Sequence, residues 1–137
     1  MSSDEQKIVD LVRAGNVDLS ELKEMFSEAS LASNVSVSDW GACYSSATGQ
    51  LSQFATVSAT NSGDTITGVG MITYTSNGST MLCLQYTNGF SNQWVATSVG
   101  TNLYTPPGGS SVLCIVYGWT QNSGSFYVSN ILPVGAC

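Results

Sequence analysis

The chain has 137 residues, of which 42% are hydrophobic, and this length predicts a single domain that can bury a core without support from a metal ion. Its net charge is −6 and it has only three lysine or arginine residues, so it lacks the clustered cations that nucleic-acid binding and attraction to anionic lipids require. No apolar run is long enough to span a membrane, and the acidic start does not resemble a signal peptide. We therefore expect a soluble protein that binds no nucleic acid; its compartment stays open, with secretion as one alternative.

Residues 1–33 predict an amphipathic helical segment, and they carry nearly all of the charge, with all three cations and seven of the nine acids. A first helix begins near Ser3 and ends at Gly15. Asp18, with Glu21 three residues later, predicts the N-cap of a second helix whose apolar side chains share one face. Such a pair either packs on the rest of the domain or detaches and lies on a membrane or partner. Because its polar face is acidic rather than lysine-rich, we favour the packed arrangement.

From residue 34 to residue 137, the pattern becomes an alternation of apolar and polar side chains with a period of two, which is typical of half-buried strands. Turn residues separate short runs that predict strands. These runs are Val35–Trp40, Gly41–Ser46, Leu51–Ala59, Thr65–Thr75, Thr80–Thr87, Trp94–Val99, Val112–Trp119 and Ser125–Leu132. Many short strands with regular turns are typical of a sandwich or barrel. We expect a mainly β domain, an antiparallel β-sandwich preceded by the helical segment.

The stretch from Gly68 to Val99 contains the strongest hairpin signal. Two runs of β-branched and aromatic residues flank Asn77-Gly78, a dipeptide that tolerates the positive φ angles of a tight turn. The second run leads into Thr87–Trp94, which we interpret as a polar turn that carries aromatic side chains. This turn is the best candidate for a functional surface.

Four cysteines, Cys43, Cys83, Cys114 and Cys137, are spaced too widely for a zinc site, and no histidine is present to complete one. Cys83 and Cys114 lie within predicted strands, where we expect them to be small buried hydrophobic residues. Cys43 and Cys137 are the pair to check for a disulfide, although sequence leaves the connectivity open. We expect no metal ion and no cofactor.

The composition also argues against catalysis. Without histidine, a serine or cysteine nucleophile lacks its usual base, and after the helical segment the only carboxylates are Asp39 and Asp64. Asp64 lies in a turn motif, where aspartate is common. The sequence contains no phosphate-binding glycine loop and no nucleophile-elbow motif. We therefore expect a protein that is not an enzyme.

Recognition chemistry is better represented, in a cluster of aromatic, amide and hydroxyl side chains. Such groups suit sugar rings, choline-type cations or the water-facing boundary of a bilayer. Part of the cluster is expected to be core, and Trp94 first of all, because it begins a strand. The candidate lipid- or glycan-binding residues are Tyr86, Asn88, Phe90, Ser91, Asn92, Trp94 and Tyr104.

Several short motifs in this region stand in a characteristic order. They are Gly68-Val69-Gly70, Tyr74, Ser76-Asn77-Gly78, Thr80, Asn88, Phe90-Ser91-Asn92 and Trp94. Their order resembles the actinoporins, the sphingomyelin-binding pore-forming cytolysins whose fold is shared with the fungal fruit-body lectins. Upstream, Ala14-Gly15, Leu19, Leu22-Lys23 and Asn34-Val35 to Asp39 are similar to the family's amphipathic N-terminal helix and the strand after it.

The resemblance implies a β-sandwich flanked by helices, a membrane-binding aromatic loop, and an N-terminal helix that detaches and inserts into the membrane. Phe90, Ser91, Asn92 and Trp94 would be the lipid-contact segment, and Tyr104 would stand in the later tyrosine cluster. Our first hypothesis is accordingly a non-enzymatic toxin-like module that binds lipid headgroups and forms pores with its helix.

Two other hypotheses stay open. The same surface could bind glycans, as a lectin-like protein does. Alternatively, the body of the chain could assemble with its own copies into a filament or shell, because its very low charge removes repulsion between them. The expected partner is thus a lipid headgroup, a glycan or a second copy of the chain.

Overall fold

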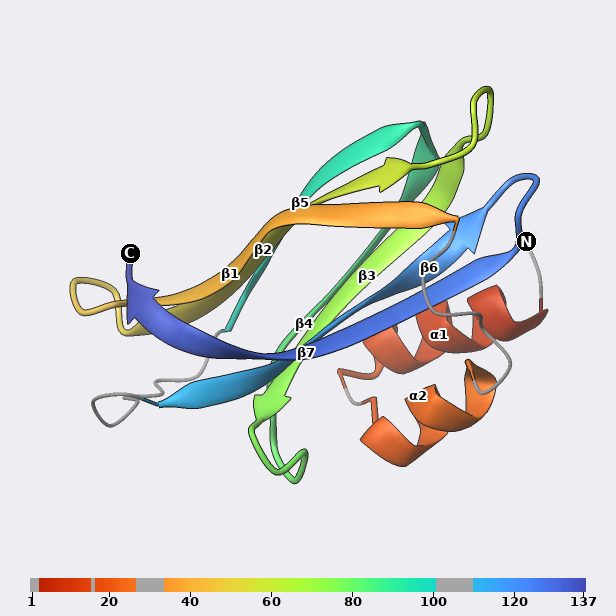
Figure 1. The fold of residues 1–137 in the computed structure, drawn as a ribbon. Coiled ribbons are helices and arrows are strands. Elements are labelled where there is room, and N and C mark those ends of the chain that lie inside the picture. The colour runs from red at the N-terminus through yellow and green to blue at the C-terminus, as the bar shows by residue number, and fades with distance from the viewer. Residues whose placement is uncertain (1–2, 16, 27–33, 101–109) are drawn as a thin grey trace.

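Two short helices and seven strands make up the described chain, which confirms the expectation of a mainly β fold preceded by a helical segment (Figure 1). The computed structural model describes residues 3–15, 17–26, 34–100 and 110–137. The elements are α1 (Ser3–Arg13), α2 (Leu19–Met25), β1 (Val35–Ser45), β2 (Gln50–Ala59), β3 (Ile66–Thr75), β4 (Met81–Ser91), β5 (Gln93–Val99), β6 (Ser111–Thr120) and β7 (Ser125–Ala136).

The strands form one sheet in the order β4-β3-β6-β7-β1-β2-β5. Every neighbouring pair is antiparallel except β1 and β7, which run parallel. The edge strands β4 and β5 follow each other in the chain with only Asn92 between them, so the sheet curls until it is nearly closed into a barrel. The structure therefore agrees only in part with the expected antiparallel sandwich. A parallel ladder joins the two halves into one mixed sheet, whose concave face packs against itself.

Three strands are longer by at least three residues than the runs that the sequence pattern predicts. β1 unites two predicted strands, because its ladder with β2 shifts register between Ser38 and Gly41, where Asp39 has a φ of 50°. β4 runs through the predicted polar turn, because its ladder with β3 extends to the pair Ile66 and Ser91. β7 is extended at its end by the parallel ladder with β1.

The inner face of the sheet is filled mainly by aliphatic side chains from both halves. The buried members are Val35, Ala42, Leu51, Ala55, Val57, Ile66, Val69, Met71, Cys83, Ala96, Val112, Cys114, Val116 and Phe126. Gln53 is also fully buried, and its amide donates to the carbonyl of Ile72 and the hydroxyl of Thr73 while accepting from the indole of Trp40. This polar group is thus satisfied within the apolar interior.

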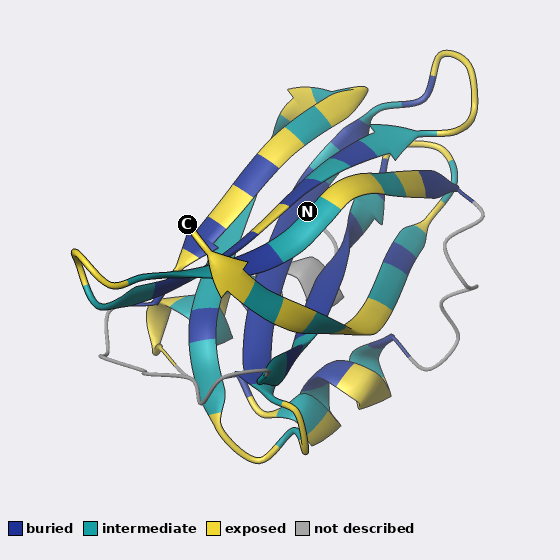
Figure 2. Cartoon of the chain, turned by 60° about the vertical axis from the view of Figure 1, so that its left-hand side comes forward, coloured by how far each residue is buried: buried dark blue, intermediate teal, exposed yellow. Residues whose placement is uncertain are grey.

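β3 is the central strand of the fold in terms of burial, because every residue from Gly68 to Tyr74 is buried (Figure 2). One face of β3 lines the inside of the curled sheet. The other face is covered by the two helices, which lie against the β4-β3-β6-β7 half (Figure 1). A strand that is covered on both faces has a nearly continuous run of apolar residues instead of an alternation of apolar and polar ones.

The helices pack on this outer face through four buried side chains, which are Ile8, Val17, Leu22 and Phe26. The hydroxyl of Tyr74 on β3 donates to the carbonyl of Val17 at 2.7 Å. The packed arrangement is therefore the one that the structure has. Asp18 has the extended backbone of an N-cap, but its side chain makes no capping hydrogen bond and instead accepts one from Ser20.

The hairpin predicted around Asn77-Gly78 joins β3 to β4, although its turn is wider than a two-residue turn. The backbone N–H of Thr75 donates to the carbonyl of Thr80, and only Gly78 within the turn has a positive φ, of 77°. The side chain of Asn77 accepts hydrogen bonds from Thr75 and Ser79, and these bonds stabilise the longer loop.

Cys43 and Cys137 form a disulfide, which ties the C-terminal residue to β1. Cys83 and Cys114 are free and buried, as expected. Burial raises the pKa of the Cys83 thiol to about 11 and that of the Cys114 thiol to about 12. Both side chains are therefore protonated at neutral pH.

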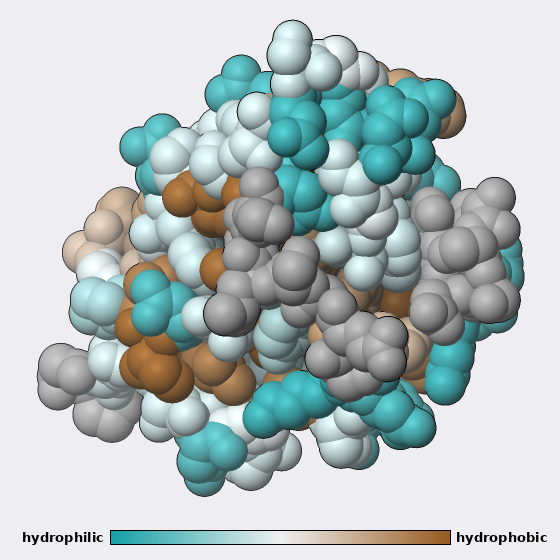
Figure 3. Space-filling model, turned by 45° about the vertical axis from the view of Figure 1, so that its right-hand side comes forward, coloured by the Kyte–Doolittle hydropathy of each residue, from teal (hydrophilic) through white to brown (hydrophobic). Residues whose placement is uncertain are grey.

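The surface carries several large hydrophobic side chains in spite of the polar composition. The exposed ones are Phe54, Phe90, Val95, Val99 and Ile131. On the face shown in Figure 3, hydrophobic patches lie between hydrophilic side chains. Within the part of the chain that the structure describes, neither helix has the length and apolar character needed to cross a bilayer.

Candidate functional site

The β4–β5 corner, residues 88–95, exposes the two most accessible large hydrophobic side chains of the described residues. Phe90 is 77% exposed and Val95 is 79% exposed. The exposed side chains of Asn88, Asn92 and Gln93 lie around them in the chain, and none of these is charged. The corner therefore presents apolar groups in an uncharged polar setting.

Hydrogen bonds hold the corner in place. The hydroxyl of Ser91 donates to the carbonyl of Gln93 at 2.7 Å. The carbonyl of Asn92 accepts from the backbone N–H of Ala59 at 2.8 Å, which fastens the corner to the end of β2. Phe90 is thus displayed on a fixed strand end and not on a loose loop.

Trp94 supports the corner from inside. Its indole N–H donates to the carbonyl of Ile66 at 3.2 Å, and its ring packs against the inner core. Gly89, at a φ of 152°, lies under this ring, where an added Cβ would come within 3.1 Å of it. The expectation that Trp94 belongs to the core agrees with this position, so it anchors the surface without forming it.

Tyr86 lies apart from the corner, although it shares the outer face of β4. Its ring stacks on Tyr117 at 6.4 Å and meets Trp119 edge-on at 6.1 Å, within the cluster that the helices cover. Of the predicted residues, Asn88, Phe90, Ser91 and Asn92 are the ones that the corner brings together. Tyr104 lies outside the described residues.

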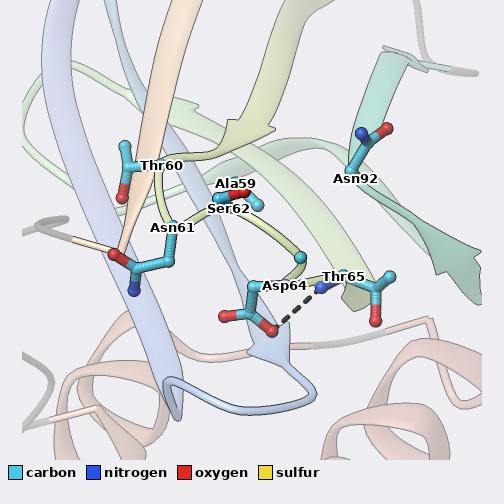
Figure 4. A pocket seen from close by; sticks show the side chains of 8 residues that line it. Ala59, Thr60, Asn61, Ser62, Asp64, Thr65 and Asn92 are labelled. Carbon is cyan, nitrogen blue, oxygen red and sulfur yellow. Dashed lines mark hydrogen bonds between the residues drawn. The ribbon is translucent and has the colours of Figure 1, made fainter.

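A polar cleft of about 430 Å³ lies beside the corner, and sequence reasoning did not assign a site to it. The loop between β2 and β3 supplies most of its lining, and Asn92 supplies the rest from the corner (Figure 4). Hydroxyl and amide side chains lining it belong to Thr60, Asn61, Ser62, Thr65 and Asn92. The only sequence signal was the run from Asn61 to Asp64, which is common turn chemistry.

Asp64 holds this loop in shape. It is 3% exposed, and its carboxylate accepts hydrogen bonds from the backbone N–H groups of Thr65 at 2.9 Å and Asn122 at 3.0 Å, and from the hydroxyl of Ser123. The Ser123 hydroxyl is the main cause that keeps the pKa of Asp64 below its usual range, although desolvation acts in the opposite direction. The carboxylate therefore joins the β2–β3 loop to the β6–β7 loop.

The two carboxylates that follow the helical segment in the sequence differ in their surroundings. Asp39 is exposed at the β1 bulge, whereas Asp64 is buried and fully occupied by protein donors. In the described parts of the chain, no three histidine, cysteine or acidic side chains lie close enough to hold a metal ion. What the arrangement offers is an apolar ring for burial and amide and hydroxyl groups for hydrogen bonds.

A scan against models of known protein families and a search of curated proteins find no match to this chain. A function can therefore be inferred only from the chemistry of the corner and of the cleft beside it.

Proposed function

We propose that the protein binds an uncharged or zwitterionic membrane surface through the β4–β5 corner. The observation that carries this proposal is the 77% exposure of Phe90 on a strand end held by hydrogen bonds. An aromatic ring flanked by amide side chains suits the headgroup region, where apolar and polar groups meet. The resemblance of this segment to the lipid-contact loop of the actinoporins points to the same surface.

The absence of charge at the corner sets its lipid preference. Asn88, Asn92 and Gln93 carry none, and the net charge of the chain is −6. Anionic lipids attract basic segments and repel acidic ones. Neutral vesicles are therefore the expected target, and anionic lipid should weaken binding.

The affinity of one copy is expected to be low. Full burial of a side chain such as Phe90 or Val95 contributes about 1.5–3 kcal/mol. Two such side chains support weak, reversible attachment of the kind that a single acyl anchor gives. Stable attachment would then come from several copies on one vesicle.

Pore formation, which the resemblance also implies, would require the helices to leave the sheet. Release would expose Ile8, Val17, Leu22 and Phe26, at about 1.5–3 kcal/mol each. This loss is comparable with the total stability of many domains. Surface binding is therefore the proposed activity, and a membrane must stabilise the freed helices if pores form.

The test is sedimentation with vesicles of phosphatidylcholine alone, with added sphingomyelin, or with added phosphatidylserine. Wild-type protein should sediment with the neutral vesicles, and Phe90→Ser should stay in the supernatant. Ile131→Ser is the matched control, because Ile131 is 50% exposed and pairs with Leu113 near the opposite end of the sheet. Equal sedimentation of Phe90→Ser and wild type, or none of wild type, contradicts the proposal. Dye release from the same vesicles reports pore formation.

The polar cleft favours a second candidate, glycan binding. Its amide and hydroxyl side chains match the hydrogen-bonding groups of a sugar, and Phe90 lies two residues from Asn92. A glycan array would then give signals that the double variant Ser62→Ala with Asn92→Ala abolishes. Both side chains are exposed, so these changes leave the core intact. An array on which wild type and the double variant give the same result excludes this candidate.

A further inference from the structure

The sequence contains two Asn-x-Ser triplets, the pattern at which a glycan is attached to an asparagine amide. Asn34-Val35-Ser36 stands at the start of β1, and Asn77-Gly78-Ser79 stands in the loop between β3 and β4. A glycan is bulky and hydrated, so the folded protein can carry one only where the amide nitrogen of the asparagine reaches solvent. The surroundings of the two asparagines therefore decide between the triplets.

The fold closes the first triplet to modification. Asn34 is 5% exposed. Its amide nitrogen donates to three consecutive backbone carbonyls, those of residues 123–125, at 3.2, 3.4 and 3.1 Å. These bonds fasten the start of β1 to the connection between β6 and β7. A sugar on this nitrogen would break them and would have to fit at a buried position, so Asn34 is not a glycan acceptor in the folded protein.

The second triplet is exposed and leaves its amide nitrogen free. Asn77 and Ser79 are both exposed. The side-chain oxygen of Asn77 accepts from the backbone N–H of Ser79 at 3.0 Å, and from the hydroxyls of Ser79 and Thr75 at 2.7 and 2.8 Å. Because a backbone N–H can only donate, the atom that it contacts is the oxygen, and the other atom is the amide nitrogen. That nitrogen makes no hydrogen bond with the residues that the structure describes.

The disulfide between Cys43 and Cys137 is an independent observation that favours a glycosylating compartment. Disulfides form and persist in the lumen of the endoplasmic reticulum and outside the cell, and they are rare in the cytosol. N-linked glycans are added in that same lumen. The protein thus combines an accessible acceptor with a bond that is made where such acceptors are modified.

We propose that Asn77 is an N-glycosylation site, whose donor is an oligosaccharide linked to a lipid through a diphosphate. In the transfer, the amide nitrogen of Asn77 forms a bond to the anomeric carbon of the first sugar and loses a proton. The bond between that carbon and the diphosphate breaks, and the lipid diphosphate leaves with the electron pair. Ser79 supplies the hydroxyl that the pattern requires at its third position.

The position of Asn77 is compatible with the proposed membrane-binding surface. The loop that carries it precedes β4, whereas the β4–β5 corner lies at the other end of that strand (Figure 1). A glycan at Asn77 therefore extends from the opposite end of the strand and leaves Phe90 uncovered. Glycosylation does not depend on membrane binding, because no residue of the triplet belongs to the corner.

The experiment is expression of the full chain, behind a cleavable secretory leader, in a eukaryotic cell line. The secreted protein is treated with peptide N-glycosidase and followed by gel electrophoresis and mass spectrometry. Wild type should lose the mass of one glycan, and the enzyme should leave aspartate at position 77. Asn77→Gln and Ser79→Ala should carry no glycan, whereas Ser79→Thr, which keeps the hydroxyl, should carry it as wild type does. Ser36→Ala is the matched control, because it destroys the first triplet at an exposed serine and should leave the glycan in place.

Two results would overturn the proposal: a secreted wild-type chain that carries no glycan, or a glycan that remains on Asn77→Gln. Circular dichroism of each secreted variant shows that the fold is retained. Phe90→Ser should be glycosylated as wild type is, even when it no longer sediments with vesicles. Failure of glycosylation and failure of the membrane-binding corner are thereby told apart.

Discussion

Gly70 makes room for the aromatic cluster on the outer face of the sheet. It pairs with Tyr86 on one side and with Tyr117 on the other, and the two rings stack above it with an interplanar angle of 12°. A Cβ at this position would lie 2.0 Å from the Tyr117 ring. The missing side chain is therefore a packing requirement of the cluster.

We expect Gly70→Ala to lower the free energy of unfolding by about 1–3 kcal/mol, the range for overpacking a core. Urea unfolding followed by tryptophan fluorescence measures this change. Gly135→Ala is the control, because a Cβ there meets its nearest neighbour, the Ala42 carbonyl, at 3.9 Å. Equal losses in the two variants would show that the space above Gly70 is not limiting.

Asp64 makes stability depend on pH in the acid range. Its hydrogen bonds lower its pKa in the folded protein below the ordinary value of 3.8, so its contribution is fully present above that value. The contribution is lost as pH falls through the lower folded-state pKa. Asp64→Asn should therefore be less stable than wild type at neutral pH, with a difference that shrinks in strong acid. Urea unfolding of both proteins over this range measures it, and a constant difference would contradict the assignment.

At the scale of elements, the attachment of the helices decides whether they can leave the sheet. Leu22 is fully buried against the outer aromatic cluster. Leu22→Ala should lower the free energy of unfolding by about 2–5 kcal/mol. Tryptophan fluorescence in the same experiment includes the signal of Trp119, whose ring centre lies 5.4 Å from that of Phe26, so it responds to the packing of the helices.

Glu24→Ala, on the exposed side of α2, serves as the control for Leu22→Ala. It should leave the free energy of unfolding within about 0.5 kcal/mol of wild type. A loss below about 1 kcal/mol for Leu22→Ala would mean that the helices are loosely held. That result would favour the detachable helix of the pore-forming hypothesis.

The elements themselves could largely be predicted from local sequence, whereas their connections could not. Alternating side chains located the strands, and Asp18 marked the start of the second helix. The run from Thr87 to Trp94 has the asparagine and glycine content of a turn, yet it forms strand because distant residues such as Ile66 supply its ladder partners. The candidate site likewise has one part that local sequence indicates and another that depends on distant contacts. Phe90 was predicted from its chemistry, but the cleft depends on contacts of Asp64 with Asn122 and Ser123, which no local pattern contains.

At the scale of the whole molecule, the disulfide fixes the end of the chain to the β1–β7 junction. Cys43 and Cys137 are separated by 94 residues, and closing a loop of that size stabilises the folded state by about 4.7 kcal/mol in the chain-entropy model. The double variant Cys43→Ser with Cys137→Ser should lose about that amount in urea unfolding. Reductant should lower wild type to the same level and leave the variant unchanged. A reductant effect on the variant would point instead to Cys83 or Cys114.

The position of β7 between β6 and β1 also determines when the two halves of the sheet can join during synthesis on the ribosome. Strands β1, β2 and β5 form one half of the sheet and β3, β4 and β6 form the other. Among the ladders of the residues that the structure describes, β7 (residues 125–136) alone links the two halves. β7 is the last of the seven strands to be synthesised, so the edges of β6 and β1 have no partner until it emerges. Pairings between segments that are distant in the sequence also form slowly. A nascent chain that stalls before residue 125 would therefore expose two open edges at once, which makes it a substrate for chaperones.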